Sequence, residues 1–231
     1  MLLRQFFGAA LLVAATLALG AFTSDGAHAQ GTATLIGEGS CVGERACEGL
    51  TGKVGINSCN GFLACRGSSG RVENNSCIGD FACISNSGRI ADHSCDWAGA
   101  CFGNNRRIGH DSCNFAVSAC SDNAGRIGDR SCVGVAIAGP APCIANSGIV
   151  GDDSCNGLGC ADNNGRIGEN SCNGAYFVLG GPFFAACTNN TGAIGDFSCN
   201  SANACRNNSG TIGNIQCNSR EACPDNTGRI P

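Results

Sequence analysis

The residues with the richest chemistry in this chain are its 20 cysteines, about one in twelve of the 231 residues. A thiol forms a disulfide, binds a soft metal ion or acts as a nucleophile, and the spacing of the cysteines separates these uses. Other reactive side chains are scarce, because the chain has only 3 histidines, 1 tryptophan and 1 tyrosine. The cysteines therefore dominate any prediction of what the chain does.

The cysteines fall into ten consecutive pairs. The step from the second cysteine of one pair to the first of the next is always 12 residues, whereas the step within a pair is 6 in most repeats and 7, 11, 5 or 15 in four middle ones. This pattern is typical of a solenoid, whose stacked coils keep their register while insertions bulge from one edge. In chain order the pairs are Cys41 and Cys47, Cys59 and Cys65, Cys77 and Cys83, Cys95 and Cys101, Cys113 and Cys120, Cys132 and Cys143, Cys155 and Cys160, Cys172 and Cys187, Cys199 and Cys205, and Cys217 and Cys223.

Two further columns of the repeat can be read directly. The seventh residue after each second cysteine is always Val or Ile, so this column is predicted to face inward. The third residue after it is Asn in eight repeats, from Asn86 to Asn226, usually with Gly two residues later. Asn and Gly tolerate left-handed backbone, so this segment is predicted to be a turn in which stacked Asn side chains bond one another between coils.

These columns predict an all-β fold, a parallel β-solenoid of ten coils of about 18 residues. No apolar stripe with helical period is long enough for a helix. Three inward anchors per turn suggest a triangular cross-section, and the handedness stays open. We expect the solenoid over residues 41–231, a lead-in with a first strand over 30–40, and loop insertions at 133–142 and 173–186.

The first 29 residues have the features of an export signal. Arg4 precedes a nearly continuous apolar run from Phe6 to Phe22, and Ala27-His28-Ala29 has the small-x-small pattern that signal peptidase cleaves. We therefore predict a secreted protein, at the cell surface or in an extracellular or periplasmic space, with no transmembrane segment after cleavage. Such compartments are oxidising, so the even number of cysteines favours a disulfide framework.

Two disulfide connectivities remain open. Bridges within each coil, pairing the cysteines in order, would each contribute about 2.4 kcal/mol by loop entropy. Cysteines of one column in adjacent coils, about 4.8 Å apart, are also within disulfide reach. The spacing lacks the CxxC pattern of zinc ribbons, so no metal site and no cofactor are predicted, although metal binding by reduced thiols is kept as an alternative function.

The Cys-x5-Cys step, as in Cys59 to Cys65 and Cys199 to Cys205, resembles that of exported cysteine-rich β-solenoids, of which the beetle antifreeze proteins are the best-known small members. The resemblance implies the same architecture over most of the mature chain. It also implies ice binding as an alternative function. The chain departs from this family at the flat array of paired threonines, which its few threonines do not form: Thr51, Thr188, Thr191, Thr211 and Thr227.

A basic column stands one residue before the inward aliphatic column, and it is predicted to face out. Evenly spaced cations suit repeating carboxylates or phosphates, so this column is a candidate stripe for an anion or an acidic polysaccharide. A second interpretation is a solvated ladder of weak ion pairs with the acidic residues three positions later, from Asp92 to Asp196. The column begins with Lys53, Arg71, Arg89, Arg107, Arg126 and Arg166, and its last member is Arg229.

The two largest insertions are apolar and leave the same edge two coils apart. Large exposed apolar patches mark contact sites, so these loops are candidates for partner binding through Ile137 in the first and Tyr176, Phe177, Phe183 and Phe184 in the second. The alternative is that the loops fold against each other or against the rod as a small satellite core.

The remaining composition narrows the function. His93 and His110 have no triad or metal set beside them, so the chain is not expected to be an enzyme. A net charge of -4 and a pI near 5.3 argue against nucleic acid as a partner. We expect a non-enzymatic exported scaffold that presents loops and a charged face to an unidentified protein or polysaccharide. An open coil end is also expected to favour end-to-end self-association.

Overall fold

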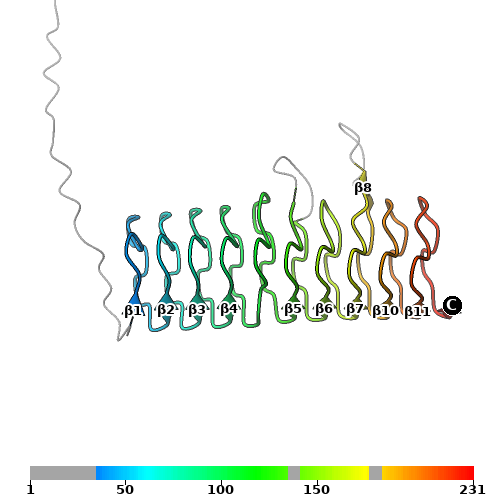
Figure 1. The fold of residues 1–231 in the computed structure, drawn as a ribbon, viewed down its shortest axis with the longest axis horizontal. Coiled ribbons are helices and arrows are strands. Elements are labelled where there is room, and N and C mark those ends of the chain that lie inside the picture. Colours follow the sequence, from blue (N-terminus) through cyan, green and yellow to red (C-terminus); the bar gives the residue numbers. More distant parts are fainter. Residues whose placement is uncertain (1–34, 135–140, 177–183) are drawn as a thin grey trace, which may run out of the picture.

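The computed structural model describes residues 35–134, 141–176 and 184–231, and it is an all-β parallel β-solenoid. The coils stand side by side in a single row, and both insertions leave the same edge of that row (Figure 1). Coil 1 begins at Cys41, and each later coil begins at the first cysteine of its pair. The predicted fold class is confirmed. The described residues form no helix, and so no helix among them is long and apolar enough to cross a membrane.

Every coil except coil 4 contributes a parallel strand of only two residues, β1 precedes coil 1, and strands of neighbouring coils pair in parallel. One sheet has the order β1-β2-β3-β4 and the other the order β12-β11-β10-β7-β6-β5, while β8 and β9 form an antiparallel hairpin. The bounds are β1 Leu35–Ile36, β2 Lys53–Val54, β3 Arg71–Val72, β4 Arg89–Ile90, β5 Arg126–Ile127, β6 Ile149–Val150, β7 Arg166–Ile167, β8 Ala175–Tyr176, β9 Phe184–Ala185, β10 Ala193–Ile194, β11 Thr211–Ile212 and β12 Arg229–Ile230.

The column that precedes each strand explains why the sheet is interrupted at coil 4. This column is glycine in most coils, because a Cβ at Gly125, Gly148 or Gly165 would overlap the carbonyl oxygen of the next coil. Coil 4 has Arg106 there instead, and its Ile108 forms only isolated bridges to Ile90 and Ile127. Side-chain bulk at a place of close backbone approach thus weakens pairing locally.

The inward column of Val and Ile is buried as predicted. In coils 1 to 9 these side chains are at most 4% exposed, and Ile230 at the end of the row is half-buried. They pack with the cysteines and with small alanines, such as Ala64, Ala82 and Ala100, into one continuous core that runs the length of the row. The small alanines leave room for the sulfur atoms beside them.

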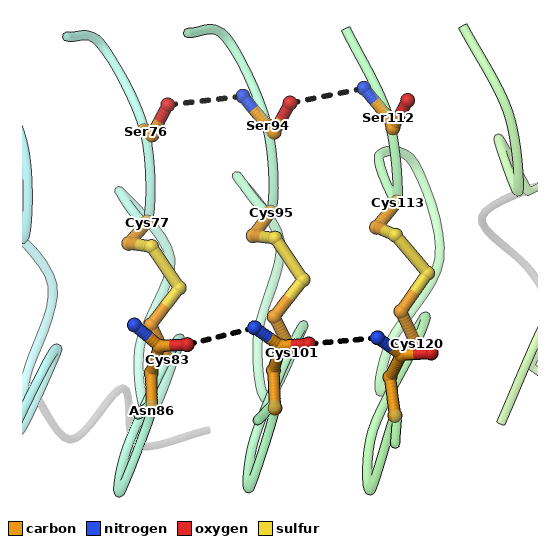
Figure 2. The surroundings of a disulfide bond; sticks show 12 residues. Ser76, Cys77, Cys83, Asn86, Ser94, Cys95, Cys101, Ser112, Cys113 and Cys120 are labelled. Carbon is orange, nitrogen blue, oxygen red and sulfur yellow. Dashed lines mark hydrogen bonds between the residues drawn. A yellow bond between two sulfur atoms is a disulfide. The ribbon is translucent and has the colours of Figure 1, made fainter. Parts of the chain in front are cut away.

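Two ladders of buried polar side chains also line the interior (Figure 2). Asn104 donates from Nδ2 to Oδ1 of Asn86 at 2.8 Å, and Asn123 donates in the same way to Asn104, so the predicted bonding of stacked Asn side chains between coils is confirmed. The serine before the first cysteine of coils 1 to 9 forms the second ladder: Ser94 Oγ accepts the N–H of Ser112 at 3.1 Å. Burial costs little when every polar group has a partner.

The backbone turns sharply at the cysteines themselves. Cys59 and Cys65 have φ of 59° and 56°, and most of the remaining cysteines share this left-handed conformation. Non-glycine residues adopt it at a cost of roughly 1–2 kcal/mol each. The disulfide between the two corners and the hydrogen bonds to the neighbouring coils hold these residues in place.

Candidate functional site

All 20 cysteines lie in the described residues, and the structure joins them in ten disulfides. Each bridge connects the two cysteines of one pair in chain order, so it lies within a coil and closes the inter-cysteine segment. Of the two connectivities that the spacing left open, the structure has the one within coils. A sulfur in a disulfide is not available as a thiolate ligand or nucleophile. The disulfides also indicate an oxidising, extracellular-type environment.

The side chains of the basic column form an exposed row on the outer face of the two parallel sheets. Sheet register places Lys53 beside Arg71 and Arg71 beside Arg89. The bridges of Ile108 to Ile90 and Ile127 place Arg107 between Arg89 and Arg126. Five successive coils therefore each present a cation. Arg166 is separated from this run, because Ile149 occupies the same position in coil 6.

Among the described residues, ion pairs along this column form only at its start, and their acidic partner, Glu73, is not one of the acidic residues expected to pair with it. Glu73 lies 2.6 Å from Arg89 and 3.4 Å from Arg71, measured from Oε1 to the nearest guanidinium nitrogen. In the described part of the chain, Arg107, Arg126 and Arg166 make no ion pair.

The acidic residues expected to neutralise the column have another role. Oδ1 of Asp129 accepts the backbone N–H of His110 at 3.0 Å, and Oδ1 of Asp152 accepts that of Asp129 at 2.9 Å. Asp92 and Asp196 cap backbone N–H groups of the preceding coil in the same way. Among the described residues, none of these four aspartates forms an ion pair with an arginine of the column. Their carboxylates complete the hydrogen bonding between coils.

A shallow open groove follows the first coils of the basic column. Lys53 and Arg71 line one part of it, while Glu73, Asn74 and Asp92 line the rest. Its wall thus carries both cationic and anionic side chains. Within the described ranges, the cations of this run that make no ion pair are Lys53 in the groove and Arg107 and Arg126 further along.

The bases of the two insertions are packed on the rod. The insertion of coil 8 starts and ends in the hairpin β8–β9, in which Tyr176 pairs with Phe184. A Cβ at Gly174 would overlap the backbone of Ser201 in coil 9, and Ala185 and Ala202 are buried in this region. This arrangement resembles a satellite core at the base of the loop. The candidate contact residues Ile137, Phe177 and Phe183 lie outside the described residues.

A row of aromatic side chains on the same edge was not predicted from the sequence. Phe62, Phe81, Trp97 and Phe115 occupy the inter-cysteine segments of coils 2, 3, 4 and 5. Phe62 and Phe81 meet edge to face with centroids 5.3 Å apart, and Trp97 and Phe115 lie 6.4 Å apart. Phe81 and Phe115 remain 43% and 55% exposed, so solvent reaches the row. The sequence feature that indicates this row is an aromatic residue in each of four successive inter-cysteine segments, next to the first insertion.

One carboxyl oxygen on this edge has no hydrogen-bond partner among the described residues. Asp96 Oδ1 is buried and accepts no hydrogen bond from any described residue. Burial raises the pKa of Asp96 to about 6, while N–H groups of Ile78 and Cys77 and the nearby His93 oppose this rise and Asp111 adds to it. His110, one of the two histidines considered for catalysis, has Nδ1 3.9 Å from Asp92 Oδ2.

Just over half of the chain, residues 21–137, matches the family described as a domain of unknown function, DUF7640. The chain belongs to this DUF7640 family. No curated protein and no solved structure matches the chain. The family description names no activity, so a function for this DUF7640 member has to be inferred from the geometry of the rod.

Proposed function

We propose that this protein is an exported, non-enzymatic scaffold that acts at the cell surface or in the extracellular space. The observation that carries the proposal is the division of each coil into a fixed part and a variable edge. Disulfides, buried ladders and a constant 12-residue step fix one part of the repeat. Both large insertions and the aromatic row fall on the variable edge, where a partner can reach them.

A loop exchange tests this proposal. Residues 173–186 are replaced by the five-residue segment 200–204, which is the inter-cysteine segment of coil 9. We expect the variant to be exported and folded, with an unchanged circular dichroism spectrum, because the disulfide of coil 8 still closes the shorter segment. Retention on the surface of the producing cell should be lost. Equal retention of the native chain and the folded variant would contradict the role of the loop edge.

A second candidate function rests on the basic column, which could bind an acidic polysaccharide. The run of five cations in successive coils supports it, together with the lack of ion pairs at Arg107 and Arg126 within the described residues. The test measures binding of polygalacturonate by Arg107→Ser/Arg126→Ser, with Arg66→Ser, a cation paired with Glu48, as the matched control. We expect a loss of about tenfold in affinity for the double variant alone, with strong dependence on salt. Equal affinity of all three proteins would reject this function.

Ice binding and metal binding by thiols have less support. Among the outward residues of the described parallel strands, Thr211 is the only threonine, whereas antifreeze-type ice binding needs a flat threonine array. A recrystallisation assay tests ice binding directly. Metal binding by thiols requires reduction of the disulfides first, so metal in the native mass spectrum of the fully reduced chain is its test.

A further inference from the structure

Two surfaces of different chemistry run along the same stretch of the rod. The basic column presents one exposed cation in each of coils 1 to 5, and the aromatic row presents one ring in each of coils 2 to 5. Figure 1 shows the parallel strands along one edge of the row of coils and β8, at the base of an insertion, at the opposite edge. Because the surfaces lie on opposite edges, the two surfaces of one molecule cannot contact each other.

The aromatic row lies among carboxylates. From coil 2 to coil 9, the inter-cysteine segments contain no lysine or arginine. Asp80 precedes Phe81, and the backbone N–H of Asp122 donates to the carbonyl of Phe102, whose ring is also exposed. Asp80 and Asp122 are exposed, and neither forms an ion pair with any described residue. Both the ring faces and the carboxylates of this surface attract a cation.

The basic column has the chemistry that this surface fits. A guanidinium group stacks on aromatic rings and binds carboxylates with paired hydrogen bonds. Arg107 and Arg126 are exposed and make no ion pair within the described ranges, and they belong to coils 4 and 5, as do Trp97 and Phe115. Both surfaces repeat once per coil, about every 4.8 Å, so successive cations of one molecule match successive rings of another. A second copy of this chain is a partner with that spacing.

We propose that the aromatic row of one molecule binds the basic column of a second copy, so that the rods associate side by side. The two surfaces differ, so the contact is heterologous. They also lie on opposite edges, so each added copy leaves one surface of each kind free, and the assembly grows as a layer of rods. This contact is distinct from addition at the coil ends. It goes beyond the scaffold role and does not depend on it.

The experiment measures sedimentation of the purified exported chain, with its disulfides intact, over a hundredfold range of concentration. We expect the average mass to rise above that of the monomer with concentration in about 50 mM salt and to fall back in about 500 mM salt, because salt screens exposed charges. Trp97→Ala/Phe115→Ala and Arg107→Ser/Arg126→Ser should each raise the concentration needed for association about tenfold or more.

An equimolar mixture of these two variants gives the sharpest result. The first variant keeps its basic column and the second keeps its aromatic row, so together they should form a 1:1 complex that does not grow further. Each variant alone should remain a monomer at the same concentration.

A matched control and a further variant complete the design. Phe197→Ala/Arg206→Ser removes an exposed ring and an exposed cation from coils 8 and 9, and it should associate like the native chain. Asp80→Asn/Asp122→Asn removes two charges with little change of shape, and it replaces the alanine variant if that variant does not fold. A monomer at every concentration in low salt would overturn the proposal. Association that neither surface variant weakens would also overturn it, as would a mixture of the two variants that stays monomeric.

Discussion

At the scale of single residues, the interior depends on polar side chains that are fully paired. The residues directly after the first cysteine of each coil show this pairing at the edge that carries the inter-cysteine loops. Asn114 donates from Nδ2 to the carbonyl of His93 at 2.6 Å, and its Oδ1 accepts the N–H of Asp96 at 3.0 Å. Asn60, Asn173 and Asn200 make the same pair of bonds. Asp96 has a second carboxylate oxygen in place of the amide group that donates in these residues, and its Oδ1 has no hydrogen-bond partner among the described residues.

Asp96→Asn should therefore stabilise the protein at neutral pH. The pKa of Asp96 is raised to about 6 in the folded chain, so the folded state binds more protons than the unfolded state between about pH 4 and pH 6. Its contribution to stability falls as pH rises through this window, reaching a penalty of about 2 kcal/mol after allowance for partial exposure. Urea unfolding at pH 4 and pH 7 should show a gain for the variant at pH 7 that largely disappears at pH 4.

The reverse change provides the control for this prediction. Asn114→Asp places a carboxyl group at the equivalent position of the next coil, so it should destabilise the protein more at pH 7 than at pH 4. A gain for Asp96→Asn of the same size at both pH values would show that the titration of Asp96 is not the cause.

The buried Asn ladder should be much more sensitive to truncation than exposed Asn residues. Asn123 is fully buried and bonds Asn104, Asn146 and the backbone of Gly125. Asn123→Ala leaves these groups without partners and should lower the free energy of unfolding by about 2–3 kcal/mol. The exposed Asn105→Ala should change it by less than about 0.5 kcal/mol. Equal effects of the two substitutions in urea titrations would contradict a ladder that stabilises the fold.

At the scale of the elements, the weak point of the sheet is coil 4. The backbone N–H groups of Arg71 and Arg126 donate to the glycine carbonyls Gly88 and Gly148 of the next coil at 3.0 Å. The N–H groups of Arg89 and Arg107 make no such bond to any described residue. Arg106 stands at the glycine column between them, in the coil where the two parallel sheets are interrupted.

Arg106→Gly should join the two sheets. Glycine at this position would let coil 4 adopt the backbone geometry of the other coils and add up to two backbone hydrogen bonds, each with a net contribution of about 0.5–1.5 kcal/mol, against a small entropic cost of glycine. The amide of Arg107 should exchange with deuterium more slowly than in the native chain.

The converse variant is Gly165→Ala, whose Cβ would overlap the carbonyl oxygen of Gly192. It should destabilise the protein and speed amide exchange in coils 7 and 8. Unchanged exchange at Arg107 in the glycine variant would show that Arg106 is not what interrupts the sheet.

At the scale of the whole molecule, strictly periodic features were predictable from the sequence. The fixed step of 12 residues, the Val and Ile column and the Asn column each repeat at one position, so they indicate a solenoid, its inward face and the ladder of Asn side chains. The Ser ladder was also periodic, but serine is compatible with surface or core, and only the stacked backbone shows that its hydroxyl groups are buried.

Other features depend on distances and side-chain directions that the repeat pattern does not specify. Two disulfide connectivities satisfied the same spacing, because the distance across a coil and the distance between coils are both within reach of a disulfide. The partners of Asp129 and Asp152 depended on whether each carboxylate pointed to a guanidinium or to a backbone N–H. Exposed arginine side chains have many rotamers of similar energy, so sequence spacing alone does not fix their ion pairs.

The central claim is that ten bridges within coils convert a thin core into a rigid rod. The most direct test is a disulfide map of the exported protein, digested with pepsin in acid so that thiol exchange is suppressed. We expect a mass about 20 Da below that of the reduced chain and ten bridges in chain order, from Cys41–Cys47 to Cys217–Cys223. Bridges between first cysteines of adjacent coils, such as Cys77 with Cys95, or a full complement of free thiols would contradict this account of the fold.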